Sequence, residues 1–147
     1  MRYMLLIYIK EAEHDSRPPE ERQRAVEGHV ALMDETTKRG VLVGVNPLAR
    51  TVAATTVRVE NGKVLATDGP FAETREQLAG YYILDCQDLD EAIAWAARIP
   101  NCHGALGCVE IRPVQELPVV PDSFRKSNAA LGSIFKDQES QYANAKV

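Results

Sequence analysis

The chain has 147 residues, of which 45% are hydrophobic and 26% charged, and its formal net charge at pH 7 is -4. This composition is typical of one globular domain with its own hydrophobic core, and it excludes disorder of the whole chain. Lysine and arginine are scattered among acidic residues, so direct binding to nucleic acid, which needs clustered positive charge, is not expected. No segment has the roughly 20 apolar residues of a membrane span and no signal-peptide pattern is present, so we expect a cytoplasmic protein without a membrane partner.

The first part of the chain predicts a strand followed by a helix. Tyr3–Ile9 is an apolar run rich in β-forming residues, which indicates a buried strand. Pro18 and Pro19 precede two glutamates, a combination favoured in the first turn of a helix. A basic pair before Gly40 predicts the end of this helix. Between these points, apolar side chains recur at helical spacing in a stripe of Val26, Val30, Met33 and Thr37, with Ala25, His29 and Leu32 beside it.

The middle of the chain predicts strands. Val41–Val45 indicates one strand, and Thr55–Glu60 and Lys63–Thr67 indicate two more around Asn61-Gly62. Asn-Gly between two β-rich runs is a strong signal for a two-residue hairpin turn. Tyr81–Asp85 predicts the next strand.

A second helix and a last strand follow. Asp88 and Glu91 have the spacing of a capping box, which predicts a helix start at this point. An apolar helical face follows, and Pro100 predicts the end of the helix. Cys108–Val114 indicates the last strand of the core.

Apart from the hairpin arm, the predicted order is β-α-β-β-α-β, which is the ferredoxin-like split βαβ pattern of an α+β fold. Two helices would cover one face of the sheet and leave the other face bare and apolar. Pairing of two such faces gives a homodimer, a dimeric α/β barrel. We expect this domain over residues 1–115. Residues 116–147 predict a C-terminal extension with a short helix.

The sequence predicts neither a disulfide framework nor a cofactor. Three cysteines are present, Cys86, Cys102 and Cys108, and an odd number without a signal peptide argues against disulfides. Cys102 precedes His103, but the spacing matches no familiar metal-ligand pattern. No phosphate loop, dinucleotide fingerprint or nucleophile elbow occurs.

Several segments resemble the YCII-related family, in its DGPF-domain branch. The signature stretch is Thr67–Thr74 (TDGPFAET), followed by Glu76–Tyr82 (EQLAGYY). The opening Tyr3–Tyr8, the segment Leu89–Arg98 and the closing Val109–Val114 also resemble this family. The resemblance covers about residues 1–115 and implies the ferredoxin-like fold of the dimeric α/β-barrel superfamily.

The resemblance also implies a candidate histidine. Members of the family carry a histidine in the first helix, paired with an aspartate just after the second helix. His29 resembles that histidine, but Ile99 stands before Pro100 where the aspartate is expected. An imidazole at the edge of a pocket can transfer protons near neutral pH. The alternative is a structural histidine that is hydrogen-bonded at the helix–core boundary.

Asp68 could supply the missing carboxylate and fix the tautomer of His29. The alternative is that Asp68 organises the turn before Gly69 and Pro70. Further candidates for ligand contact are Phe71 as a core or pocket-wall residue, Glu73, Tyr81 and Arg112, the last two near the ends of strands. Arg112 could instead form a surface or intersubunit ion pair.

Two functional hypotheses follow. The first is a small cytosolic homodimer that binds a small organic molecule and performs cofactor-free acid–base catalysis, an isomerisation or elimination, with His29 and Asp68. The second is a non-catalytic module that senses a ligand. Relatives in the DGPF branch often accompany extracytoplasmic-function sigma factors, so the resemblance implies a regulatory link to a sigma factor for the second hypothesis.

Overall fold

The computed structural model describes residues 1–100 and 106–115. Met1–Val114 form one compact unit. The predicted short helix of the C-terminal extension lies outside the described residues, as do Cys102 and His103. The elements in chain order are β1 (Arg2–Ile9), α1 (Glu11–Asp15), α2 (Pro19–Lys38), β2 (Leu42–Pro47), the 3₁₀ turn η1 (Thr51–Ala53), β3 (Thr55–Glu60), β4 (Lys63–Asp68), β5 (Gln77–Asp85), α3 (Leu89–Ala96) and β6 (Gly107–Pro113).

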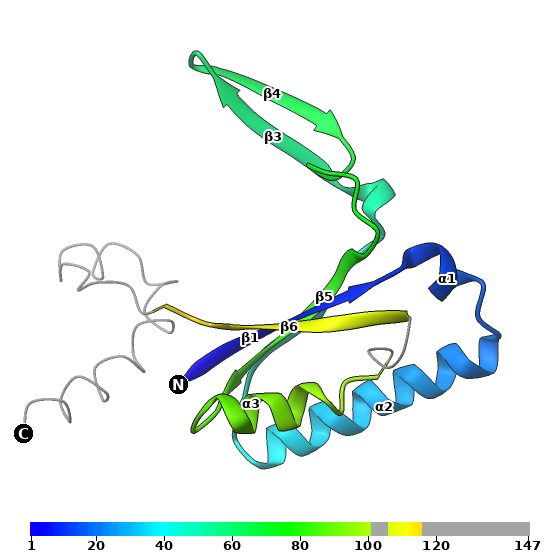
Figure 1. Cartoon of the computed structure of the whole chain (residues 1–147), viewed down its shortest axis with the longest axis vertical. Helices are drawn as coiled ribbons and strands as arrows, with labels where there is room; N and C mark the ends of the chain where they lie inside the picture. The colour runs from blue at the N-terminus through cyan, green and yellow to red at the C-terminus, as the bar shows by residue number, and fades with distance from the viewer. Residues whose placement is uncertain (101–105, 116–147) are drawn as a thin grey trace, which may run out of the picture. The chain divides into compact units, whose positions relative to one another are not determined.

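In the part of the chain that the structure describes, two antiparallel sheets and three helices make an α+β fold (Figure 1). The four-stranded sheet has the order β2-β5-β1-β6, and β3 and β4 form a two-stranded sheet of their own. Burial alternates along β1, as expected for a strand with one face on a core. Its buried side chains are Tyr3, Leu5, Ile7 and Ile9, and those of intermediate exposure are Arg2, Met4, Leu6 and Tyr8.

The core lies between the four-stranded sheet and the two longer helices, α2 and α3, which cover the same face (Figure 1). Leu32 of α2 and Trp95 of α3 pack with the buried side chains of β1 and β5. The guanidinium groups of Arg39 and Arg98 lie over the Trp95 ring, 5.1 and 4.9 Å from its centroid. These contacts join α2 and α3 at the end of the core away from the cavity described below.

The predicted ends of α2 are confirmed, but its buried positions lie beside the predicted stripe of Val26, Val30, Met33 and Thr37 and not on it. Pro19 is the first residue of the helix, and Gly40 follows its C-terminus with a positive φ of 71°, the conformation that favours glycine there. The buried positions are Ala25, Leu32 and Thr36. Val26 and Val30 are 55% and 54% exposed, because their stripe faces a cavity rather than the packed core.

Local turn and cap signals are also confirmed. Asn61 and Gly62 have φ values of 51° and 74°, which a primed hairpin turn requires. The Asp88 carboxylate accepts a hydrogen bond from the Glu91 backbone N–H at 2.9 Å. The strand after Gly40 was predicted to end at Val45 but continues through Pro47. Because β2 is an edge strand, the missing N–H of proline costs it no ladder hydrogen bond.

Two other elements differ from the prediction, the start of β5 and the short helix α1. The strand predicted at Tyr81–Asp85 begins at Gln77, which pairs with Ile9. The charged stretch after β1 forms the five-residue helix α1, which the sequence did not predict. Within the described residues, no helix is long and apolar enough to cross a membrane.

Candidate functional site

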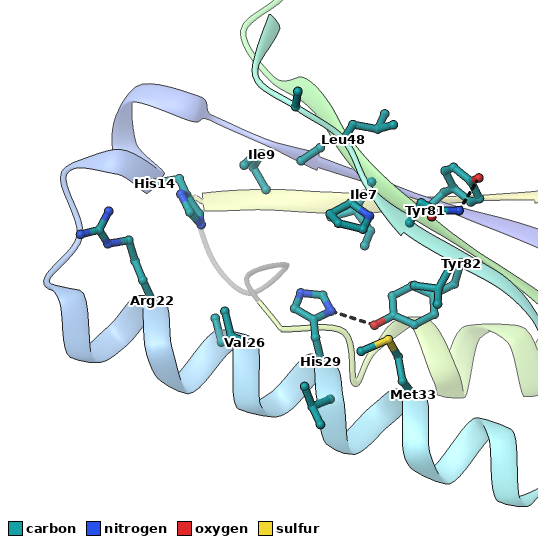
Figure 2. Close-up of a pocket in the computed structure, with 18 of the residues that line it drawn as sticks. Ile7, Ile9, His14, Arg22, Val26, His29, Met33, Leu48, Tyr81 and Tyr82 are labelled. Carbon is teal, nitrogen blue, oxygen red and sulfur yellow. Dashed lines mark hydrogen bonds between the residues drawn. The ribbon is translucent and has the colours of Figure 1, made fainter. Parts of the chain in front are cut away.

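A cavity of about 550 Å³ lies between α2 and the sheet and is lined by residues of β1, β2 and β5 and by His14 of α1 (Figure 2). Its walls are mostly apolar and include Ile7, Ile9, Val26, Met33, Val45 and Leu48. Figure 2 shows Arg22 and His14 toward one end of the cavity and Tyr82 toward the other. The size and the apolar lining suit a small organic molecule.

His29 and Tyr82 form a hydrogen-bonded polar pair in this cavity, on the side away from Arg22 and His14. His29 Nδ1 lies 2.8 Å from the Tyr82 hydroxyl, and the two rings are nearly parallel, with an interplanar angle of 12°. Tyr82 is only 1% exposed because it points from β5 into the core under α2. A buried, rigid strand residue therefore fixes the orientation of the imidazole.

Burial lowers the pKa of His29 below its usual value of 6.5 because the charged form is disfavoured away from water. The imidazole is therefore neutral at pH 7. Its second nitrogen, Nε2, points away from Tyr82 into the cavity (Figure 2). If Nδ1 carries the proton and donates to the tyrosine oxygen, Nε2 is a base. If the hydroxyl donates to Nδ1, then Nε2–H is a hydrogen-bond donor.

The end of the cavity near α1 is basic. Arg50 Nη2 lies 2.9 Å from His14 Nδ1 and also contacts the Asp15 carboxylate. His14 Nδ1 also lies 3.5 Å from the Asp15 carboxylate, so Arg50, His14 and Asp15 form one polar cluster. The carboxylate of Glu11 accepts hydrogen bonds from the backbone N–H and the hydroxyl of Thr51, at 3.0 and 2.8 Å. The unpredicted helix α1 thus anchors the segment that carries Arg50.

Asp68 does not lie in the cavity that contains His29. It is the last residue of β4 in the two-stranded sheet, it is exposed, and it does not line the cavity. The position of Asp68 next to Gly69, whose φ is 94°, fits the turn interpretation. The hydrogen-bond partner that His29 does have is Tyr82.

The remaining predicted contacts divide into one cavity residue and three surface residues. Tyr81 borders the cavity, and its hydroxyl accepts a hydrogen bond from the Asn46 side chain at 2.9 Å. Phe71 was predicted to fill the core or the pocket wall, but it is 77% exposed. It lies in the segment between β4 and β5, outside the packed core. Glu73 is exposed in the same segment.

Arg112 lies on β6 and is largely exposed, with its guanidinium 3.7 Å from the Glu110 carboxylate. This contact is the surface ion pair that the sequence offered as the alternative. Ile99, which stands where the family aspartate is expected, is 0% exposed and belongs to the hydrophobic core. At this position, an apolar side chain that packs in the core therefore takes the place of the carboxylate expected from the family.

The described cysteines have protonated thiols at neutral pH. Burial raises the pKa of Cys86 to about 11, and burial and a hydrogen bond to Glu76 raise the pKa of Cys108. Within residues 1–100 and 106–115, no three metal-ligating side chains are grouped closely enough to hold a metal ion. Thiolate nucleophiles are therefore not a feature of the described cavity.

Sequence reasoning missed Arg22, His14, Arg50 and the partner role of Tyr82. Arg22 stands seven residues before His29, which places both on one helical stripe, so a signal for Arg22 existed. His14 and Arg50 come together through a long-range contact between α1 and the segment after β2. No local pattern marks such a pair.

The fold and the cavity define a small α+β protein with a histidine–tyrosine pair in an apolar pocket. The model of the YCII-related domain matches residues 1–118. A protein of Rhizobium meliloti (strain 1021), described as uncharacterized, is 38% identical over 114 residues, which cover 78% of this chain and 92% of that protein. The chain belongs to the YCII-related family.

Proposed function

We propose that this chain binds a small organic molecule in the cavity beside α2 and performs cofactor-free acid–base chemistry on it. The observation that carries the proposal is the 2.8 Å contact between His29 Nδ1 and the Tyr82 hydroxyl inside an apolar cavity. A neutral imidazole with a fixed ring orientation and a nitrogen facing the ligand is suited to proton transfer. Asp68 has no part in this version of the site.

The proposed step needs no oxidant or reductant. Nε2 of His29 takes a proton from a carbon next to an electron-withdrawing group, while Nδ1–H donates to the Tyr82 oxygen. In an elimination, the electron pair of the C–H bond becomes a double bond and the leaving group departs with its own bonding pair. In an isomerisation, the imidazolium returns the proton to another atom of the same ligand.

The proposal includes the assembly of the protein. The strand order β2-β5-β1-β6 with both long helices on one face supports a ferredoxin-like split βαβ fold. The opposite face of β1 presents Met4, Leu6 and Tyr8, which are only partly buried within one chain. We infer a homodimer in which two such faces meet as a dimeric α/β barrel, and a place for the chain in the DGPF branch.

Exchange of carbon-bound hydrogen for deuterium tests the base directly. Phenylacetone in D₂O has acidic benzylic protons, and ¹H NMR follows their loss in the presence of the protein. We expect exchange above the buffer rate with the wild-type chain and loss of that excess with His29→Gln, which can hydrogen-bond but is a poor base. Arg24→Gln is the control on the same helix, because Arg24 does not line the cavity. Equal exchange by wild type and His29→Gln would refute the role of His29 as the base.

A second candidate is a non-catalytic ligand sensor, in a regulatory setting with a sigma factor. The partner of His29 is a phenol rather than a carboxylate, and the family aspartate is replaced by the buried Ile99. Both features weaken the imidazole as a base. Ligand binding in the cavity without any exchange that depends on His29 would favour this candidate.

A further inference from the structure

Apart from the tyrosine phenols of Tyr81 and Tyr82, the ionisable side chains that line the cavity are all basic. They are Arg22, Arg50, His14 and His29, and no aspartate or glutamate is among the described residues that line it. The chain as a whole has the opposite balance, with 21 acidic residues against 17 lysines and arginines. An apolar cavity whose lining contains cationic side chains and no carboxylate offers complementary charge to an anion.

The two arginines differ in how their charge is compensated. Arg50 contacts the Asp15 carboxylate and donates to His14. Among the described residues, no hydrogen bond or ion pair joins the Arg22 guanidinium to a carboxylate. Its helical neighbours three and four residues away are Pro18, Pro19, Ala25 and Val26, none of which can form an ion pair.

The stability of α2 gives no reason for a cation at this position. Arg22 is the fourth residue of the helix, where the helix dipole is positive and basic side chains are disfavoured. An anion bound beside Arg22 would interact favourably with both the guanidinium group and the helix terminus. The cavity position and the charge of Arg22 therefore point to binding rather than to folding.

Helix geometry sets the size of the ligand. Arg22, Val26 and His29 fall on one stripe of α2, and seven residues correspond to about 10 Å along a helix axis. Between the two ends, the lining is apolar and includes Val26, Ile7 and Ile9 (Figure 2). A molecule that touches both ends has an anionic group at one end, an apolar body, and a reacting or polar group near His29.

The geometry points to an organic carboxylate as the ligand, with its carboxylate on Arg22 and its apolar body directed toward the His29–Tyr82 pair. This inference rests on the proposed function, because it names the class of molecule for the same cavity. Arg22 acts as a positioning and specificity residue: it selects the anion and does not touch the reacting carbon.

A matched pair of probes tests the inference on the full chain. 3-Phenylpropanoate and its neutral amide, 3-phenylpropanamide, have the same apolar body and differ in charge. NMR titration would follow the Met33 methyl group and the His29 ring, which both line the cavity. We expect the carboxylate to bind about tenfold or more tightly than the amide, the range of a charged hydrogen bond.

Two variants on the same helix distinguish a specific contribution of Arg22 to carboxylate binding from the general effect of removing one positive charge. Arg22→Gln is expected to abolish the preference for the carboxylate and to leave the amide affinity and the unfolding midpoint unchanged. Arg24→Gln, which removes a charge two residues away and outside the cavity lining, is expected to keep the preference.

The outcomes distinguish the two levels of the proposal. Equal affinity of the wild-type chain for both probes, or equal loss with Arg22→Gln and Arg24→Gln, overturns the carboxylate inference while the cavity remains a ligand site. If neither probe perturbs Met33 or His29 at millimolar concentration, the ligand-binding function itself fails together with the inference.

Discussion

The hydrogen bond between His29 and Tyr82 can be measured by a double-mutant cycle. Tyr82→Phe removes the hydroxyl and keeps the ring, which matters because Tyr82 is 1% exposed and its ring packs in the core. His29→Leu removes both ring nitrogens and keeps an apolar side chain of similar size. The double variant completes the cycle, so that every effect other than the contact between the two side chains cancels.

The expected coupling free energy follows from the geometry. The contact is short, at 2.8 Å between His29 Nδ1 and the hydroxyl oxygen, and it joins two neutral groups because burial keeps the pKa of His29 low. A neutral hydrogen bond contributes about 0.5–1.5 kcal/mol net to stability. Tyr82 is buried whereas His29 faces a cavity that water can enter, so we expect a coupling near the middle of that range, about 1 kcal/mol.

Urea unfolding at pH 7.5, followed by far-ultraviolet circular dichroism, gives the four free energies of unfolding. Tyr81→Phe combined with His29→Leu serves as the control pair, because the Tyr81 hydroxyl contacts Asn46 instead. A coupling below about 0.3 kcal/mol, within the usual range of additivity, would mean that the hydrogen bond does not form in solution.

Two further predictions concern the whole domain. Because burial lowers the pKa of His29 below 6.5, the unfolded chain takes up this proton first; the contribution of His29 to stability is therefore complete above pH 6.5 and is lost as the pH falls through the folded-state pKa. Urea unfolding between pH 7.5 and 5 is expected to show a shallower loss for His29→Gln than for wild type, and identical slopes would contradict the assignment. At the β1–β6 pair, a Cβ on Gly107 would lie 2.1 Å from the Tyr8 carbonyl oxygen, so Gly107→Ala must displace the backbone and is expected to cost more than about 2 kcal/mol in thermal unfolding. A melting temperature within a degree of wild type would show that the strand pairing differs from the one described.

The features that could be predicted from sequence are those that neighbouring residues determine. The hairpin at Asn61-Gly62 depends on two positive φ angles, and the start of α3 depends on Asp88 and the N–H of Glu91. The end of α2 depends on Gly40 in the same way. In each case the chemistry lies within four residues, so the sequence contains all the information that the local structure needs.

The features that could not be predicted depend on tertiary contacts. Helical periodicity indicated the stripe of Val26 and Val30 but could not show that it faces a cavity, while Leu32 faces the core. Phe71 has the composition of a core residue, yet its segment contributes nothing to the core. The pairing of His29 with Tyr82 joins residues 53 positions apart, and only the sheet register decides which of two adjacent tyrosines points toward α2.

The partner of the histidine determines the chemistry that this cavity favours. A carboxylate behind an imidazole would raise its pKa and stabilise the imidazolium that forms when the base takes a proton. Tyr82 supplies a neutral phenol instead, and burial lowers the pKa of His29. A base of this kind is unprotonated at neutral pH but weak, so it suits carbon acids that are already activated by an adjacent carbonyl group or leaving group. The basic group at the other end of the cavity, Arg22, lies about two helical turns from His29 along α2. Its charge can therefore orient an anionic ligand. Because the interaction between charges weakens with distance, Arg22 lowers the basicity of the imidazole less than an adjacent cation would.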